Sequence, residues 1–515
     1  MKTGSLLIIS TGIILSFPLY AGEDVEATYI QHCAECHGPD RLGGTGPALL
    51  PENLTRLRKQ ESVSVIRSGR PATQMTGFAD RLDDQDIASL AEFIYMPPDS
   101  PPRWGEEEIS ASHIVNPMEN ESRQPVYDAD PLNLFLVVES GDHHITVLDG
   151  DRMEPIFRFK SRYSLHGGPK YSSDGRYVYL ASRDGWVSRF DMYQLKMMAE
   201  IRVGINTRNI AVSSDGRFVI AGNYLPHTLV ILNADDLSLN KIIQVTDQLG
   251  NSSRVSAVYD ARPRNSFIVA LKDLTEIWEI PYSDDAEPIY PGLVHDYRYQ
   301  EAIPLEGPFP VRRIRLDDYL DDFFLDEGYQ NVIGAARNGS NGQVVSLLAG
   351  RKIADIPLKG LPHLGSGIIW EYQGRKVLAT PNLQKAEVSV IDMQDWKVIK
   401  QIKTLGPGFF MRSHEKSAYA WVDVFFGPDK DAVHVIDKNT LEIVKTLRPV
   451  PGKTSGHVEF TRNGDYALLS IWEMDGAIIV YDAETLEEVK RIPMKKPSGK
   501  YNVYNKISLD AGTSH

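Results

Sequence analysis

A short apolar strand pattern recurs along most of this chain and constrains its fold more than any other feature. Each copy is a run of four or five mostly apolar residues that ends in Asp or Asn, and copies occur at residues 145–149, 187–191, 229–233, 388–392, 433–437 and 478–482. The last residues of neighbouring copies (149, 191, 233 and then 392, 437, 482) lie 42, 42, 45 and 45 positions apart. Several strands per unit at a period of about 40–45 residues are typical of a β-propeller.

The number of blades follows from two further copies. Weaker runs near residues 277–280 and 344–347 fill the gap between 233 and 392 and bring the total to eight. A turn sequence also repeats, since Ser-Ser-Asp-Gly-Arg begins at Ser172 and again at Ser213, 41 positions later. A single blade cannot bury both of its faces, so the blades close into a ring that leaves no exposed edge. We therefore predict an all-β eight-bladed propeller over residues 113–515, with a central mouth that suits a large planar ligand.

A motif of different chemistry precedes the repeats. Cys33, Cys36 and His37 form the C-x-x-C-H pattern of c-type heme attachment. Two thiols at this spacing can add to the two vinyl groups on one edge of a porphyrin, and the next residue then directs its imidazole to the iron. A redox-active or zinc-binding cysteine pair is the alternative. We predict covalent heme c, attached through Cys33 and Cys36, with His37 as an iron ligand.

A second axial ligand for this heme is predicted at Met75. This residue lies in a loop before a helix, and in this respect it resembles the methionine ligand of class I cytochromes c. An ordinary core methionine is the alternative. The helix begins at residues 83–86, and its apolar side chains share one face: Ile87, Leu90, Ala91 and Ile94. These features together predict an all-α class I cytochrome c domain over residues 22–97.

The segments on either side of this domain have distinct compositions. Residues 1–21 combine Lys2, a short apolar stretch and a terminal Ala21, which is the pattern of a cleaved signal peptide. An uncleaved anchor is the alternative, because Leu19 stands where a small residue is usual. Residues 98–112 begin with a proline-rich run and are predicted to be a stiff linker. No later segment approaches the length of a membrane span, so we expect a periplasmic mature chain without one.

The overall charge excludes some partners. The chain has 55 Lys and Arg against 69 Asp and Glu, which gives a net charge of −14 at pH 7. Nucleic acid binding requires concentrated positive charge, so we expect no nucleic acid partner. Adhesion to anionic lipid is disfavoured for the same reason.

Side chains suited to ligand binding or proton transfer occur in glycine-rich turns of the repeat region. His166, His363 and His457 each lie in such a turn, and these turns cluster on one rim of a propeller, where loops carry function. A satisfied structural role is the alternative for each of them. Several arginines directed into one cavity would bind carboxylates through paired hydrogen bonds. The candidates near the same blades are Arg183, Arg208, Arg254 and Arg412.

The order of cytochrome c domain, linker and eight-bladed propeller resembles that of the cytochrome cd1 nitrite reductases and their relatives. The likeness covers the mature chain, and its most specific stretches are residues 204–208, 220–224, 361–363 and 497–505. It implies that the propeller binds heme d1 and that His166 is the proximal ligand of the d1 iron. It also implies that basic side chains face the carboxylates of this pigment, namely Arg183, Arg208 and Arg254.

One departure separates this chain from the nitrite reductases. The resemblance implies two histidines above the d1 iron, which bind and protonate nitrite, and His363 matches one of them. The other would fall within residues 307–313, which contain no histidine, and an acidic insert follows at residues 316–324. The pattern is similar instead to the dihydro-heme d1 dehydrogenases of this family, which complete heme d1 biosynthesis by oxidising a propionate side chain to an acrylate.

Within this branch the resemblance implies a role for each site residue. His166 and His363 ligate the d1 iron on opposite faces, His457 is the base or proton relay, and Tyr501 assists it by hydrogen bonding. Arg208 holds a carboxylate of the substrate, dihydro-heme d1. Electrons leave through heme c to a soluble acceptor, and a cytochrome cd1 nitrite reductase receives the heme d1. A nitrite reductase and a non-catalytic heme d1 carrier stay open as alternatives.

Overall fold

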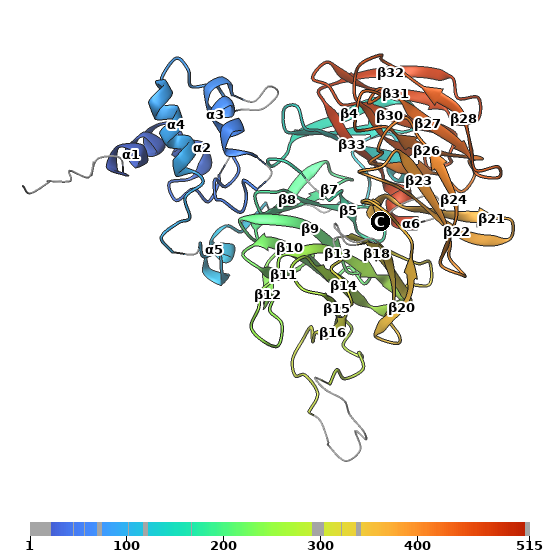
Figure 1. The fold of residues 1–515 in the computed structure, drawn as a ribbon, viewed down its shortest axis with the longest axis horizontal. Coiled ribbons are helices and arrows are strands. Elements are labelled where there is room, and N and C mark those ends of the chain that lie inside the picture. The colour runs from blue at the N-terminus through green and yellow to red at the C-terminus, as the bar shows by residue number, and fades with distance from the viewer. Residues whose placement is uncertain are drawn as a thin grey trace, which may run out of the picture.

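The computed structural model describes residues 22–44, 46–55, 57–69, 75–100, 102–116, 122–165, 167–290, 303–320, 322–335 and 341–509. The predicted signal peptide (1–21) and His166 lie outside the described residues. Figure 1 shows a small helical domain beside a large ring of sheets. This arrangement confirms the predicted fold class, an all-α domain followed by an all-β domain.

The helical domain is built from four helices: α1 (Gly22–His32), α2 (Ala34–His37), α3 (Lys59–Ser68) and α4 (Asp84–Phe93). The carboxylate of Asp83 caps α4 by accepting the N–H of Asp86 at 2.8 Å. The four side chains predicted to share one face of this helix are all buried, and they pack with Tyr29 of α1 and Ile66 of α3. Burial of an apolar side chain of this size contributes about 1.5–3 kcal/mol, so this face holds the helices together.

The large domain consists of eight antiparallel sheets, here called blades 1 to 8. Blade 1 contains β2 (Leu134–Glu139), β3 (His144–Asp149), β4 (Glu154–Lys160) and β33 (Pro497–Asn502), and blade 2 contains β5 (Lys170–Tyr171), β6 (Tyr177–Ala181), β7 (Trp186–Asp191), β8 (Lys196–Arg202) and β1 (Ile114–Val115). Blade 3 contains β9 (Asn206–Val212), β10 (Phe218–Leu225), β11 (Thr228–Asn233) and β12 (Leu239–Gln244), and blade 4 contains β13 (Val255–Ala261), β14 (Ser266–Leu271), β15 (Glu276–Pro281) and β16 (Arg312–Arg315).

Blades 5 to 8 are each built from four consecutive strands. Blade 5 contains β17 (Asp322–Leu325), β18 (Asn331–Ala335), β19 (Gly342–Ser346) and β20 (Arg351–Ile356), and blade 6 contains β21 (Ile368–Tyr372), β22 (Arg375–Pro381), β23 (Glu387–Asp392) and β24 (Lys397–Lys403). Blade 7 contains β25 (Met411–Ser413), β26 (Tyr419–Asp423), β27 (Val433–Asp437) and β28 (Glu442–Leu447), and blade 8 contains β29 (Ser455–Phe460), β30 (Tyr466–Ile471), β31 (Gly476–Asp482) and β32 (Glu488–Met494). Short helical segments precede, join or follow these strands: α5 (Glu106–Ala111), α6 (Val503–Ser508), η1 (Pro131–Asn133), η2 (Arg262–Arg264) and η4 (Leu364–Ser366).

The repeat predicted from the sequence corresponds to one strand of each blade. The six clear copies are β3, β7, β11, β23, β27 and β31, and the two weak copies are β15 and β19. Each of these strands pairs on both sides within its blade, and most of its residues are buried. The prediction of eight blades is confirmed.

The ring is closed by a strand from the far end of the repeat region. β33 pairs with β2 in blade 1, with Leu136 opposite Tyr501 and Val137 opposite Lys500. Hydrogen bonds between strands so distant in sequence remove the open edge that blade 1 would otherwise present. The same closure carries Lys500 and Tyr501 to the interior of the ring, where Lys500 is fully buried and Tyr501 is half-buried.

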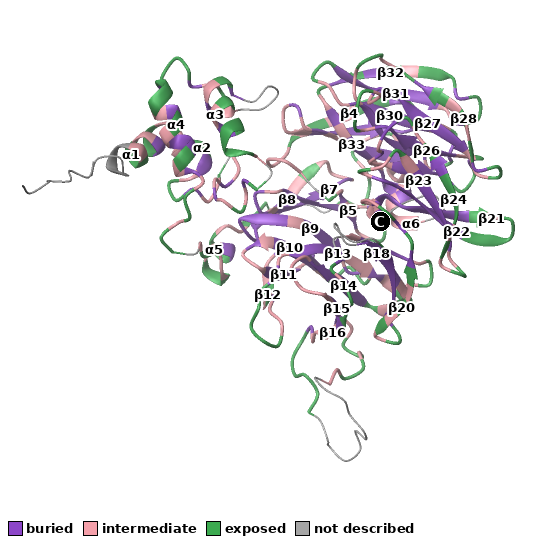
Figure 2. Ribbon diagram, in the orientation of Figure 1, coloured by how far each residue is buried: buried purple, intermediate pink, exposed green. Residues whose placement is uncertain are grey.

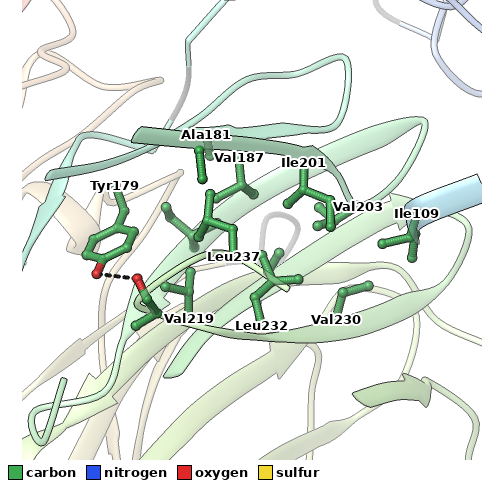
Figure 3. Packing of buried hydrophobic residues seen from close by; sticks show 14 residues of the cluster. Ile109, Tyr179, Ala181, Val187, Ile201, Val203, Val219, Val230, Leu232 and Leu237 are labelled. Atoms are coloured by element: carbon green, nitrogen blue, oxygen red, sulfur yellow. Dashed lines mark hydrogen bonds between the residues drawn. The ribbon is translucent and has the colours of Figure 1, made fainter. Parts of the chain in front are cut away.

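Hydrophobic side chains fill the spaces between neighbouring blades. Figure 2 shows the buried residues concentrated along the blade interiors. Between blades 2 and 3, Figure 3 shows Val187 and Ile201 packed against Val219 and Leu232. In the same layer the Tyr179 hydroxyl donates to the Ala234 carbonyl oxygen at 2.8 Å. Each blade therefore covers the face that its neighbour cannot bury alone.

The segment predicted as a linker (98–112) contains a helix and packs against the propeller. Ile109 of α5 is buried in the core between blades 2 and 3. The Trp104 indole N–H donates to the Arg202 carbonyl oxygen at 2.9 Å, and the Arg202 guanidinium lies 4.3 Å from the Trp104 ring. Arg202 also donates to the carbonyl oxygen of Leu42 in the helical domain. These contacts attach the helical domain to blades 2 and 3.

Within the described residues, no helix is both long and apolar enough to cross a bilayer.

Candidate functional site

The first candidate site is a cavity of about 510 Å³ in the helical domain. Cys33, Cys36, His37 and Met75 all line it, so the structure brings together the four residues predicted for heme c. His37 lies on α2, one helical turn after Cys33, and its N–H donates to the Cys33 carbonyl oxygen at 2.9 Å. The helix therefore directs both cysteines and the histidine to one cavity.

The orientation of His37 suits an iron ligand. Its Nδ1 lies 2.7 Å from the Pro47 carbonyl oxygen, and since a carbonyl only accepts, Nδ1 carries the proton and leaves Nε2 for a metal. Burial lowers the pKa of His37, which keeps the imidazole neutral. A Cβ at Gly46 would lie 2.8 Å from Cε1 of His37, so glycine is required for this close approach. The cavity and its donors fit heme c.

The propeller closes one side of the heme c cavity. Six propeller residues line it together with the helical domain: His143, Tyr163, Ser164, Arg183, Asn206 and Tyr224. Arg183 was predicted to face the carboxylates of heme d1, but the structure places it here, 5.9 Å from the Tyr224 ring. A heme in this cavity would therefore face the propeller directly.

The second candidate site is a cavity of about 410 Å³ inside the propeller. It is lined by five of the predicted residues, which come from five different parts of the ring: Arg208, His363, Arg412, His457 and Tyr501. Predicted residue Arg254 is not among those that line it. The Arg254 guanidinium instead pairs with Asp273 through two hydrogen bonds of 2.5 and 2.8 Å. These two residues are 19 positions apart, and their contact depends on the hairpin of β13 and β14.

The predicted ligand His166 lies between described residues that belong to both cavities. Tyr163 and Ser164 line the heme c cavity, whereas Leu165 and Gly167 line the propeller cavity. Gly168 has φ of +69°, and a Cβ there would lie 3.2 Å from the Tyr501 ring. Glycine is thus needed where this loop passes over Tyr501. Neighbouring residues of one loop therefore line both cavities.

His363 enters the cavity from the loop before η4. Its Nδ1 donates to the Phe409 carbonyl oxygen at 2.6 Å, and its ring centroid lies 4.6 Å from that of Phe409. Because Nδ1 carries the proton, Nε2 has the lone pair that a metal ligand needs. The tautomer and the ring orientation of His363 are therefore both fixed by Phe409.

His457 lies on β29 and lines the propeller cavity. Its imidazole packs edge-on between the rings of Phe410 and Tyr501, at centroid distances of 4.7 and 5.0 Å. Burial lowers the pKa of His457 well below 6.5, and the neighbouring cations Lys500 and Arg412 lower it further. Within the described residues, Nδ1 of His457 is buried without a hydrogen-bond partner. The site thus holds a neutral imidazole that can accept a proton.

Cations surround this histidine. Lys500 is fully buried, and its ammonium group donates to the His457 carbonyl oxygen and, at 3.0 Å, to the Ser470 hydroxyl. Arg412 lies 3.5 Å from Glu459, and Lys506 lies 5.5 Å from the Tyr501 ring. Burial lowers the pKa of Lys500 and of Lys506 well below 10.5, and an anionic ligand would favour their charged forms. Sequence reasoning did not identify Lys500 and Lys506 as site residues, although Lys500 lies within the closing stretch at residues 497–505 and Lys506 directly follows it.

Tyr501 retains its proton in this environment. Burial raises the pKa of Tyr501 to about 12. Its hydroxyl can therefore donate a hydrogen bond near neutral pH. The residue lies on β33, so its position depends on the closure of the ring.

Comparison with known families agrees with the two-domain architecture. Residues 129–506 match the family described as the cytochrome D1 heme domain. Residues 21–94 match the family described as cytochrome C oxidase, cbb3-type, subunit III. Among related proteins, the dihydro-heme d1 dehydrogenase of Pseudomonas aeruginosa is 54% identical over 512 residues, which cover 99% of this chain and 100% of that protein.

A second related protein and a solved structure also match nearly the whole chain. The nitrite reductase of Stutzerimonas stutzeri is 25% identical over 552 residues, which cover 95% of this chain and 94% of that protein. A solved structure, described as dihydro-heme d1 dehydrogenase NirN in complex with DHE, superposes with a TM-score of 0.87 and 55% identity over 94% of this chain and 99% of that one. On this evidence, the chain belongs to the cytochrome D1 heme domain family and, within it, to the dihydro-heme d1 dehydrogenases.

Proposed function

We propose that this protein is an exported oxidoreductase that converts dihydro-heme d1 to heme d1, the last step of heme d1 biosynthesis. One observation carries the proposal: a cavity that combines His363, His457 and Tyr501 lies next to a heme c cavity in a member of this family. In the reaction, the –CH2–CH2– unit of one propionate loses two hydrogens and becomes the –CH=CH– unit of an acrylate. Two protons and two electrons are released.

His363 and His166 are the proposed ligands of the substrate iron. The hydrogen bond from Nδ1 of His363 to Phe409 supports this role, since it places the proton on Nδ1 and the lone pair on Nε2. The flanking residues Leu165 and Gly167 line the same cavity, which supports His166 as the ligand from another side. Two imidazoles from opposite parts of the ring would hold the planar pigment between them.

His457 is the proposed base that accepts a proton from the propionate side chain. Its low pKa keeps it neutral, and its contact with Tyr501 allows the tyrosine hydroxyl to orient the same side chain. Arg208, which lines the cavity, is proposed to hold a carboxylate, and Arg412 to assist it. Because Arg183 and Arg254 lie outside the lining of this cavity, we assign them no contact with the substrate.

Heme c, held by Cys33, Cys36, His37 and Met75, would supply one-electron chemistry to this site. The loop that lines both cavities supports direct transfer, since Ser164 lines one and Leu165 the other. We further propose that a soluble acceptor takes the electrons. In the periplasm, a cytochrome cd1 nitrite reductase would receive the product.

A nitrite reductase is a weaker proposal for this chain. Among the described residues, the histidines that line the propeller cavity are His363 and His457. The stretch at residues 307–313, where a further histidine would fall, does not line this cavity. Within it, the ring of Phe309 packs against Phe218 at a centroid distance of 4.9 Å.

Anaerobic incubation of the protein, carrying heme c, with dihydro-heme d1 tests the proposal. Extraction and mass analysis of the pigment should show the loss of two hydrogens, together with reduction of heme c. An unchanged pigment that stays bound would indicate a carrier instead, and nitrite-dependent release of nitric oxide would indicate a reductase. His457→Ala should keep pigment binding but lower turnover by about 10²–10⁴-fold, the usual contribution of an acid–base group. His227→Ala serves as the control, because His227 is half-buried, is bonded to Ser252 and lines neither cavity.

A further inference from the structure

A single buried carboxylate connects the two histidines of the propeller cavity. Asp423 ends β26 and is only 1% exposed. Its Oδ1 accepts the backbone N–H groups of Phe409 and Phe410 at 2.7 and 3.1 Å. Its Oδ2 accepts the backbone N–H of His457 at 3.2 Å. Asp423 does not line the cavity, so it acts on the site only through these groups.

Each of the three N–H groups belongs to a residue that positions an imidazole. The Phe409 carbonyl oxygen accepts from Nδ1 of His363, and the Phe409 ring packs on the same imidazole. The Phe410 ring packs on the imidazole of His457. A further bond from the Asp423 N–H to the Phe410 carbonyl oxygen, at 3.2 Å, fixes this pair of residues on both sides.

The backbone at His457 needs such support. Its φ is +55°, in the left-handed region that side-chain-bearing residues rarely adopt. The neighbouring Gly456 makes room for the carboxylate, since a Cβ there would lie 2.9 Å from Oδ2 of Asp423. The conformation of His457 and the position of Asp423 are therefore coupled.

We propose that Asp423 is a positioning residue that fixes the imidazoles of His363 and His457 relative to each other across the bound tetrapyrrole. The proposal rests on the function proposed above, in which one histidine holds the iron and the other accepts the proton. A proton acceptor must lie within hydrogen-bond reach of the carbon that loses the proton. A carboxylate anchored to both histidine segments sets this distance independently of the substrate.

The variant Asp423→Asn tests the proposal, because an amide has the same shape but only one acceptor oxygen. That oxygen can serve Phe409 and Phe410, and the NH2 group then faces the N–H of His457 without a bond. We expect kcat to fall at least tenfold, with KM and the visible spectrum of bound heme d1 unchanged within about twofold. The assay is run at about pH 8, because burial raises the pKa of Asp423 to about 7 and the carboxylate must be ionised.

Asp392→Asn is the matched control. Asp392 lies on β23, is 2% exposed, and also accepts two backbone N–H groups, those of Gln394 and Asp395. It lies outside both cavities, so its replacement should change the melting temperature but not kcat. Equal losses of kcat in Asp392→Asn and Asp423→Asn would overturn the proposal, as would an Asp423→Asn variant with wild-type kcat.

Two further variants separate positioning from a general structural effect. Gly456→Ala leaves the charge intact but displaces the carboxylate, and it should lower kcat at least fivefold even if Asp423→Asn does not fold. In the background of His457→Ala, Asp423→Asn should have less than a twofold further effect, since the distance between the two imidazoles matters only while His457 is the proton acceptor. Full activity in Gly456→Ala, or an additive loss in the double variant, refutes the inference. If the wild-type protein does not oxidise dihydro-heme d1 at all, the proposed function fails instead.

Discussion

The contact between the two domains leads to a quantitative prediction. The Arg202 guanidinium joins them, since it donates to the Leu42 carbonyl oxygen and stacks on Trp104 of the connecting segment. A hydrogen bond from a charged donor contributes about 1.5–3 kcal/mol, and a desolvated cation–π contact about 2 kcal/mol. Arg202→Ala should therefore weaken docking of the helical domain by about 4 kcal/mol. Since 1.4 kcal/mol corresponds to a factor of ten, the ratio of docked to undocked protein falls about 10²–10³-fold.

The consequence should appear in electron transfer and not in pigment binding. Stopped-flow mixing with dihydro-heme d1 under anaerobic conditions would follow reduction of heme c by its absorbance, and we expect the variant to be at least tenfold slower. Arg448→Ala is the control, because Arg448 pairs with Asp429 and Asp431 in blade 7, far from the junction. Reduction of heme c in Arg202→Ala within twofold of the wild-type rate would refute the assignment of Arg202 as the docking contact.

Three further predictions concern single side chains. Met75→Leu should lower the reduction potential of heme c, because a thioether ligand stabilises the reduced iron, and an unchanged potential in a spectroelectrochemical titration would exclude Met75 as ligand. Tyr501→Phe should lower turnover about tenfold with little change in KM, whereas an equal loss of pigment affinity would indicate a binding role. Burial lowers the pKa of His434 to about 4, below the value of about 6.5 in the unfolded chain. Neutral His434 therefore contributes to the free energy of unfolding above pH 6.5, and this contribution is lost as the pH falls to 4. Denaturant unfolding of the wild type should show the free energy of unfolding fall by about 3 kcal/mol over this range, and that of His434→Gln should not fall in this way. Identical pH profiles for the two proteins would contradict the prediction.

Much of the fold could be predicted because the repeat is local. The apolar strand that marks each copy lies in the middle of its blade, so burial on both sides leaves a clear signal in the sequence. The attachment motif of heme c was equally predictable, since Cys33, Cys36 and His37 lie within five residues, on or directly before one short helix. Both predictions depend on contacts between residues that are close in sequence.

The contacts within the propeller cavity could not be predicted in the same way. Arg183 lines the heme c cavity because the helical domain docks beside its loop, and Arg254 pairs with Asp273 because the hairpin of β13 and β14 brings them together. The burial of Lys500 depends on pairing with a strand more than 350 residues earlier. Asp423 gave no signal at all, since its partners are backbone groups that any sequence contains.

The strand that completes blade 1 has a thermodynamic consequence. β33 fastens the ring, and it also supplies Tyr501 to the cavity, followed by Lys506 in α6. A ligand that contacts Tyr501 together with Arg208 of blade 3 spans this seam. A ligand that binds only while β33 is paired with β2 raises, by mass action, the free energy needed to separate these two strands. The bound pigment would thus stabilise the pairing of β33 with β2. The amide hydrogens of these two strands should therefore exchange faster in the empty protein than in the protein with pigment bound.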